Sequence, residues 1–192
     1  MIFIVRLVFI LLFSYGLTNF HAHKEVIMNK QKKNNYFLTT IGLYLTIVTE
    51  LMCIFKMKYL YDFIAISFIV EFFITSVFWI LIFINQDFIR QRDSNNIPIK
   101  NKPLKEYSVH VFPFICLAWE HYNFAISYSR KHVIILNLLN VLYHLILFMY
   151  HSKNKEHLYP ILNKTGRSTK MLFSLLSFIL VNGILQLITM IY

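Results

Sequence analysis

The chain has 192 residues, of which 57% are hydrophobic and 15% are charged, against about 25% charged residues in typical soluble proteins. Its 19 Lys and Arg outnumber 9 Asp and Glu, which gives a formal net charge of +10. This composition excludes an ordinary water-soluble globule. A membrane protein with basic loops explains both the high hydrophobic content and the positive net charge. Nucleic-acid binding is not expected, because most aromatic residues lie inside apolar runs.

Signals for cofactors and metals are missing from the sequence. The two cysteines, Cys53 and Cys116, each lie inside an apolar run, which provides neither a disulfide framework nor a spaced thiolate metal site. The four glycines form no glycine-rich phosphate-binding pattern, and no H-E-x-x-H zinc motif occurs. We therefore expect no cofactor and no bound metal.

Long apolar runs bounded by charged residues predict the secondary structure. About 20 apolar residues cross a bilayer as a helix, and a helix satisfies its own backbone hydrogen bonds in lipid. The six runs, in chain order, are residues 2–17, 37–55, 63–84, 109–127, 133–150 and 171–192. The sequence thus predicts an all-α integral membrane protein, with residues 1–192 forming a single domain built as a bundle of six transmembrane helices.

The first run has an alternative interpretation, because an N-terminal apolar stretch of this length also fits a cleaved signal peptide. A basic leading region is nearly absent, and the one basic residue, Arg6, lies within the apolar run itself. We therefore favour a membrane helix. The other five spans do not depend on this choice.

Basic residues are distributed unevenly between the loops. The loops after the first, third and fifth runs hold 14 of the 19 Lys and Arg, which predicts that these loops face the cytosol and both termini face the lumen or exterior. The one glycosylation sequon, Asn163-Lys164-Thr165, lies in the fifth loop. A glycan on Asn163 would place that loop in the lumen and contradict this orientation.

Polar side chains inside the apolar runs are candidate functional residues, because they are costly in hydrocarbon. The second and fourth runs both begin at odd-numbered loops, so Thr39 and His110 are expected at similar depth near one membrane face. Thr39, Thr46 and Glu50 share one face of the predicted second helix, which we expect to point into the bundle. A threonine hydroxyl bonded to its own helix and an interfacial histidine are the alternatives.

The fifth and third runs also carry polar residues. Asn137, Asn140, His144 and His151 form a stripe on the fifth, and Glu71 lies in the middle of the third. Hydrogen bonding between helices explains such residues as well as catalysis does.

Four short motifs then occur in an order typical of a known family, with six spans and a Tyr-Pro loop before the last span. They cover most of the chain from about residue 36. The motifs are Tyr36-Phe37-Leu38-Thr39, Ser76-Val77-Phe78-Trp79-Ile80, His110 with Glu120 ten residues on, and Leu158-Tyr159-Pro160-Ile161-Leu162. Together they resemble the androgen-induced protein family.

The resemblance implies a membrane-embedded hydrolase of fatty acid esters of hydroxy fatty acids, with a threonine nucleophile and a catalytic histidine. By motif, Thr39 matches the nucleophile and His110 the histidine. Thr40 leaves the nucleophile ambiguous by one position. Val111 and Pro113 depart from the pattern that family members often show after the histidine.

The chemistry of this pair is consistent, because a threonine hydroxyl needs an adjacent base and a histidine supplies one near neutral pH. Supporting roles are expected among a small group of polar residues. These are Glu120, Glu71, Asn140, His144 and Thr40. The expected partners are a lipid ester substrate and membrane lipids, and the expected location is the endoplasmic reticulum or another endomembrane.

A non-catalytic multi-pass membrane protein, either a lipid-binding regulator or a small transporter, is the alternative function. In that case the polar stripes would line a path or fix helix packing. A transporter would favour helices interrupted by Gly or Pro at mid-membrane and an internal repeat, and neither is evident in the sequence.

Overall fold

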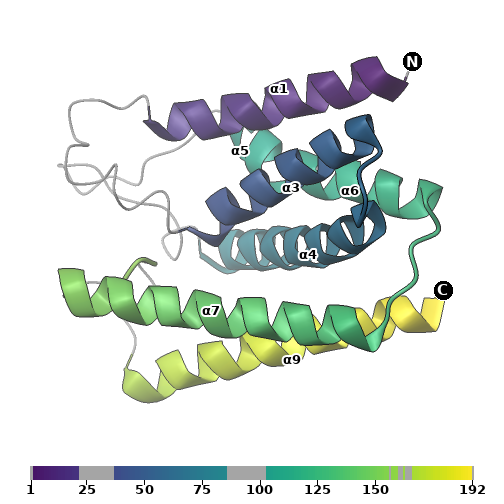
Figure 1. Cartoon of the computed structure of the whole chain (residues 1–192). Helices are drawn as coiled ribbons and strands as arrows, with labels where there is room; N and C mark the ends of the chain where they lie inside the picture. The colour runs from purple at the N-terminus through teal and green to yellow at the C-terminus, as the bar shows by residue number, and fades with distance from the viewer. Residues whose placement is uncertain are drawn as a thin grey trace. The chain divides into compact units, whose positions relative to one another are not determined.

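The computed structural model describes residues 2–21, 37–85, 103–155, 157–159, 162 and 166–191, and these residues contain helices and turns but no strand. The helices are α1 (Ile2–His21), α3 (Leu38–Phe55), α4 (Leu60–Asn85), α5 (Pro103–His110), α6 (Phe112–Asn123), α7 (Arg130–Asn154) and α9 (Arg167–Ile191) (Figure 1). The all-α prediction is confirmed for this part of the chain.

The number of membrane spans differs from the prediction. In the described ranges, α3, α4 and α7 are long and apolar enough to cross a membrane, which makes three spans and not six. α1 and α9 contain shorter apolar stretches, Phe3–Leu17 and Ser174–Gln186. The three spanning helices support association with a membrane.

The fourth predicted span, residues 109–127, is not one helix. α5 ends at His110 and α6 begins at Phe112, with Val111 between them outside regular helical geometry at φ −123° and ψ −52°. Pro113, in the first turn of α6, has no N–H to donate to the carbonyl of Val109, so a continuous helix would lose that bond. Each resulting helix is too short to span a bilayer alone.

The chain divides into two compact units. Unit 1 comprises residues 1–75 and 101–128, and unit 2 comprises residues 76–100 and 129–192. Unit 1 therefore holds α1, α3, α5, α6 and the first part of α4, whereas unit 2 holds α7, α9 and the end of α4. The single-domain organisation over residues 1–192 stays a prediction.

In unit 1, α1 packs against α3, α5 and α6. Phe13, Leu43, Val109 and Cys116 form one buried apolar cluster between these helices. A Cβ atom at Gly16 of α1 would lie 2.9 Å from the Val109 side chain, so the absence of a side chain lets α1 approach α5 closely. These contacts make α1 a component of unit 1.

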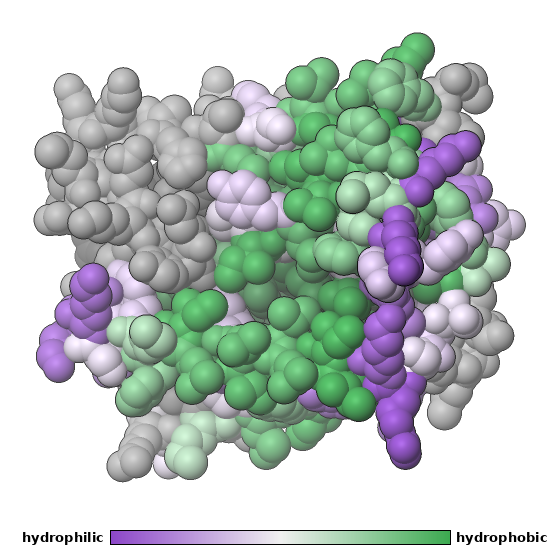
Figure 2. Space-filling model, in the orientation of Figure 1, coloured by the Kyte–Doolittle hydropathy of each residue, from purple (hydrophilic) through white to green (hydrophobic). Residues whose placement is uncertain are grey.

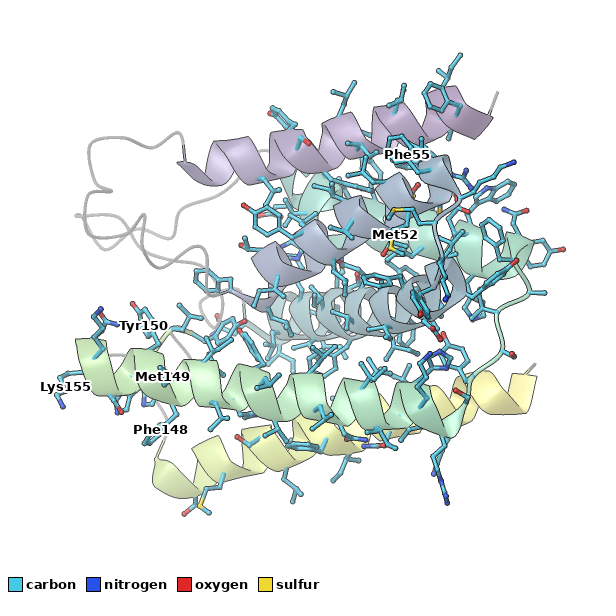
Figure 3. The ribbon with its side chains drawn as sticks, viewed as in Figure 1. Met52, Phe55, Phe148, Met149, Tyr150 and Lys155 are labelled. Carbon is cyan, nitrogen blue, oxygen red and sulfur yellow. The ribbon has the colours of Figure 1, made fainter. Side chains whose placement is uncertain are left out.

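A second apolar cluster of unit 1 lies near the turn that joins α3 to α4. It contains Met52, Cys53, Leu60, Ile64, Ala65 and Ile126 (Met52 is labelled in Figure 3). α3 ends because Lys56 adopts a left-handed conformation with φ 49°, and its N–H bonds to the carbonyl of Met52. This turn sets α3 and α4 antiparallel.

In unit 2, α7 and α9 lie side by side (Figure 1). Ser129 is the N-cap residue of α7, and its side chain and backbone form a reciprocal capping box with His132. Such a box satisfies two backbone donors that the first turn of a helix leaves unpaired. The helix ends at Lys155, which is left-handed with φ 58°.

Large apolar side chains lie exposed on α7. Leu138, Leu142, Leu145, Phe148 and Met149 are each more than half exposed, and Figure 3 labels the last two. Apolar residues cover much of the described surface in the view of Figure 2. Apolar surface of this extent is typical of contact with lipid and not with water.

Candidate functional site

The interface of α3 and α4 in unit 1 contains a line of buried polar contacts. Thr49 and Ser67 share a hydrogen bond of 2.7 Å between their hydroxyl oxygens, and Thr46 donates to Glu71 Oε1 at 3.2 Å. All four side chains are buried. The two pairs fix the antiparallel register, in which each step forward along α3 corresponds to a step back along α4.

This register places the backbone of His110 near the start of α3. Thr75, four residues after Glu71, is level with Gly42, four residues before Thr46. The Thr75 hydroxyl donates to the carbonyl oxygen of His110 at 2.6 Å, which holds the end of α5 at this level. His110 itself is buried at 8% exposure. Thr39 lies one helical turn before Gly42, so both predicted catalytic residues belong to the same end of unit 1.

The two adjacent threonines differ in exposure. Thr39 is partly exposed, whereas Thr40 is buried at 3% exposure and faces the interior of unit 1. Both lie in the first turn of α3, after the extended N-cap residue Phe37. Of the two residues, Thr39 is therefore the more accessible to a ligand arriving from outside the unit.

Glu71 is buried at 1% exposure beside Gly42. A Cβ atom at Gly42 would lie 2.6 Å from Glu71 Oε1, so the missing side chain makes room for this carboxylate. Thr46 donates to Oε1 and also to the carbonyl oxygen of Gly42, at 3.0 Å. Glu71 Oε2 has no hydrogen-bond partner among the described residues.

Glu120 lies at the opposite end of unit 1 from Thr39. It accepts two hydrogen bonds from Arg6 of α1, at 2.9 Å from Nε and 2.8 Å from Nη2. Arg6 Nε also lies 3.8 Å from Oε2 of Glu50, and Glu50 follows Thr39 by eleven residues on α3, or about 16 Å along the helix axis. Glu120 thus neutralises Arg6 at a site well away from the Thr39 end.

Asn140 and His144 belong to unit 2, where both contribute to the packing of α7 on α9. Ser177 donates to Asn140 Oδ1 at 3.2 Å, and His144 stacks on Phe178 with ring centroids 5.8 Å apart. These contacts of Asn140 and His144 agree with the alternative that the polar residues of this helix contribute to helix packing and not to catalysis.

Other residues of the family motifs lie partly within the described residues. Tyr159 shares a hydrogen bond of 2.6 Å with Tyr143 of α7, which attaches the segment before α9 to unit 2. Pro160 and the sequon at Asn163 lie outside the described residues. The sequence analysis did not predict that Arg6 pairs with Glu120, because a basic residue near the start of an apolar run normally marks the membrane boundary.

Apolar spanning helices around buried polar pairs define an all-helical, membrane-type protein. Compared with known protein families, residues 1–192 match the FAR-17a/AIG1-like proteins, and the chain belongs to this family. It is the androgen-induced protein family that the motifs resemble, so this prediction is confirmed. Comparison with curated proteins and with solved structures gave no match.

Proposed function

We propose that the protein is a membrane-embedded hydrolase of fatty acid esters of hydroxy fatty acids, with Thr39 as nucleophile and His110 as general base. The observation that carries the proposal is the hydrogen bond from Thr75 to the backbone carbonyl of His110, at the end of unit 1 that contains Thr39. Membership of the family whose motifs these residues match supports the same assignment.

The reaction proceeds in two stages. Thr39 Oγ1 attacks the ester carbonyl carbon while the neutral imidazole of His110 accepts the hydroxyl proton. The tetrahedral intermediate then expels the hydroxy fatty acid, whose oxygen takes that proton, and leaves the other acyl chain on Thr39. In the second stage His110 takes a proton from water as that water attacks the acyl-threonine carbonyl carbon. The bond to Thr39 Oγ1 then breaks, His110 returns the proton to this oxygen, and the fatty acid is released.

Two features favour Thr39 over Thr40. Thr39 is partly exposed and Thr40 is buried, so an acyl group has more room at Thr39. Thr39 also occupies the position that the family motif assigns to the nucleophile.

The hydropathy of the chain supports a lipid substrate and a membrane location. Exposed apolar helices suit the acyl chains of a lipid ester, and the basic loops suit its free carboxylate. We propose that α1, the α5–α6 pair and α9 are also embedded, which gives the six-helix bundle, in an endoplasmic reticulum or other endomembrane. A glycan on Asn163 of the expressed protein would contradict the orientation with odd loops in the cytosol.

Hydrolysis of a fatty acid ester of a hydroxy fatty acid by the purified protein in detergent tests the proposal. We expect Thr39→Ala and His110→Ala each to lower turnover at least about 100-fold, because each removes one member of the pair. Thr40→Ala is the matched control and should retain most of the activity. Loss with Thr40→Ala alone would move the nucleophile by one position.

The main competing function is that of a non-catalytic membrane protein, and partly buried polar residues that pair between helices suit it. Binding of the ester without hydrolysis by pure, folded wild-type protein would support that function. Turnover that disappears in both single variants would exclude it.

A further inference from the structure

A buried cluster of charged and thiol groups lies where α1, α3 and α6 meet in unit 1, apart from the Thr39 end. Arg6 is bonded to Glu120 through both of its carboxylate oxygens. Glu50 Oε1 accepts a hydrogen bond from the Cys116 thiol at 3.1 Å. Cys53 lies one turn after Glu50 on α3, and the side chains of Glu50, Glu120 and Cys53 are all buried.

The charges of this cluster do not balance. One guanidinium faces two carboxylates, and Arg6 gives its hydrogen bonds to Glu120 while its Nε lies 3.8 Å from Glu50 Oε2. That oxygen has no hydrogen-bond partner in the described part of the chain. If Glu50 is ionised, one negative charge is uncompensated. If Oε2 is protonated, the O–H has no acceptor there, so both forms carry a cost in a buried site.

The geometry supplies the ligands of a metal ion. One carboxylate oxygen from each of Glu50 and Glu120 and Sγ of Cys53 all lie within 4.8 Å of one another. We propose that Glu50, Cys53 and Glu120 bind a thiophilic divalent cation of the Zn²⁺ type, which accepts thiolate and carboxylate ligands together. A water molecule or a second carboxylate oxygen supplies the fourth ligand.

Binding of such an ion removes the charge imbalance. Cys53 gives up its thiol proton to water and becomes a thiolate, so three negative ligands face the two positive charges of the ion and the one of Arg6. The sum is zero. Arg6 keeps its hydrogen bonds to Glu120, because each carboxylate oxygen has a second lone pair for the metal.

The position of the cluster points to a structural role. Glu50 lies about 16 Å along α3 from Thr39, so the ion does not reach the reacting ester. It joins α3 to α6 and, through Arg6 and Glu120, both helices to α1. The Arg6 side chain is 15% exposed, so an ion would reach the buried ligands from the side of Arg6.

The test is zinc binding by the full-length protein in detergent. Chelator-treated protein is incubated with zinc chloride and desalted, its zinc content is measured, and Zn X-ray absorption is used to detect sulfur in the first coordination shell. We expect about one zinc per chain with sulfur bound for the wild type, and at least about tenfold weaker binding for Cys53→Ser. Thermal unfolding should shift upward with zinc in the wild type and not in Cys53→Ser.

Two further variants keep the result interpretable. Cys116→Ser preserves a hydrogen-bond donor to Glu50 and removes none of the three ligands, so it should bind zinc like the wild type. Glu50→Gln removes a ligand charge without changing volume, and it should lose binding even if Cys53→Ser does not fold. Wild-type protein that binds no zinc, or zinc binding that persists in both Cys53→Ser and Glu50→Gln, would overturn the proposal.

Discussion

At the scale of single residues, Gly42 lies where α3 has no side chain opposite Glu71 of α4. A Cβ atom there would lie 2.5 Å from the Ile74 side chain and 2.6 Å from Glu71 Oε1, and both neighbours are buried. Gly42→Ala should therefore force Glu71 to move from its bond with Thr46. We expect the free energy of unfolding to fall by about 1–2 kcal/mol, measured by unfolding in mixed detergent micelles.

Gly183 of α9 is the matched control. Nothing lies within 4 Å of a Cβ atom at Gly183, so Gly183→Ala meets no obstacle and gains about 0.5–1 kcal/mol of helix propensity. Equal stability changes of the same sign in the two variants would contradict this account of Gly42.

Arg6 offers a second test at this scale. Arg6→Met leaves Glu120 and Glu50 buried without their cation, which costs about 3–5 kcal/mol for a fully buried pair. Because the Arg6 side chain is 15% exposed, we expect a smaller loss of about 2–3 kcal/mol in the free energy of unfolding. Glu120→Gln in the same background should recover part of the loss, since it removes one stranded charge.

Arg130 provides the comparison for this loss, because it is an exposed basic residue at the start of α7. Arg130→Met should change the free energy of unfolding by less than about 0.5 kcal/mol. If Arg6→Met is no worse than Arg130→Met, the pair between Arg6 and Glu120 does not hold α1 in place.

The sequence predicted some of these residues and not their partners. The period of the second run indicated that Thr46 and Glu50 face the interior, and both are fully buried. It gave no sign that Glu50 and Glu120 share Arg6, because residues 6, 50 and 120 are brought together only by tertiary packing. The same separation explains why no metal-ligand spacing was visible.

At the scale of helices, the sequence predicted where several helices lie, but it did not predict the break between α5 and α6. The runs at 37–55, 63–84 and 133–150 correspond to α3, α4 and α7 within a few residues. The run at 109–127 is apolar before and after Pro113, so its composition did not indicate the break between α5 and α6. The hydroxyl of Thr75 bonds a backbone carbonyl at this break, a side-chain contact that periodicity does not reveal.

The pairing of α7 with α9 depends on a reciprocal amide contact. Asn137 and Asn182 exchange two hydrogen bonds, at 3.2 and 3.1 Å. A double-mutant cycle of Asn137→Ala and Asn182→Ala, read by unfolding in mixed micelles, should give a coupling free energy of about 0.6 kcal/mol and at most about 1.7. Additive single changes would show that the two amides do not stabilise each other.

At the scale of the whole molecule, family membership agrees with the fold class, while the catalytic assignment rests on one end of unit 1. Composition predicted a membrane-type helical protein, and the three spanning helices confirm that class. The proposed catalytic pair, Thr39 and His110, was predicted from short motifs, and the two residues lie 71 positions apart in the sequence. Sequence alone could not show that Thr75 brings the backbone of His110 to the level of Gly42.

The central claim is that Thr39 and His110 act together on an ester. Its most direct measurement is hydrolysis of a fatty acid ester of a hydroxy fatty acid by purified wild type, Thr39→Ala, His110→Ala and the double variant. The account predicts that each single variant falls at least about 100-fold and that the double variant is no worse than either, because the two residues act as one unit. Unchanged turnover in both single variants would contradict it.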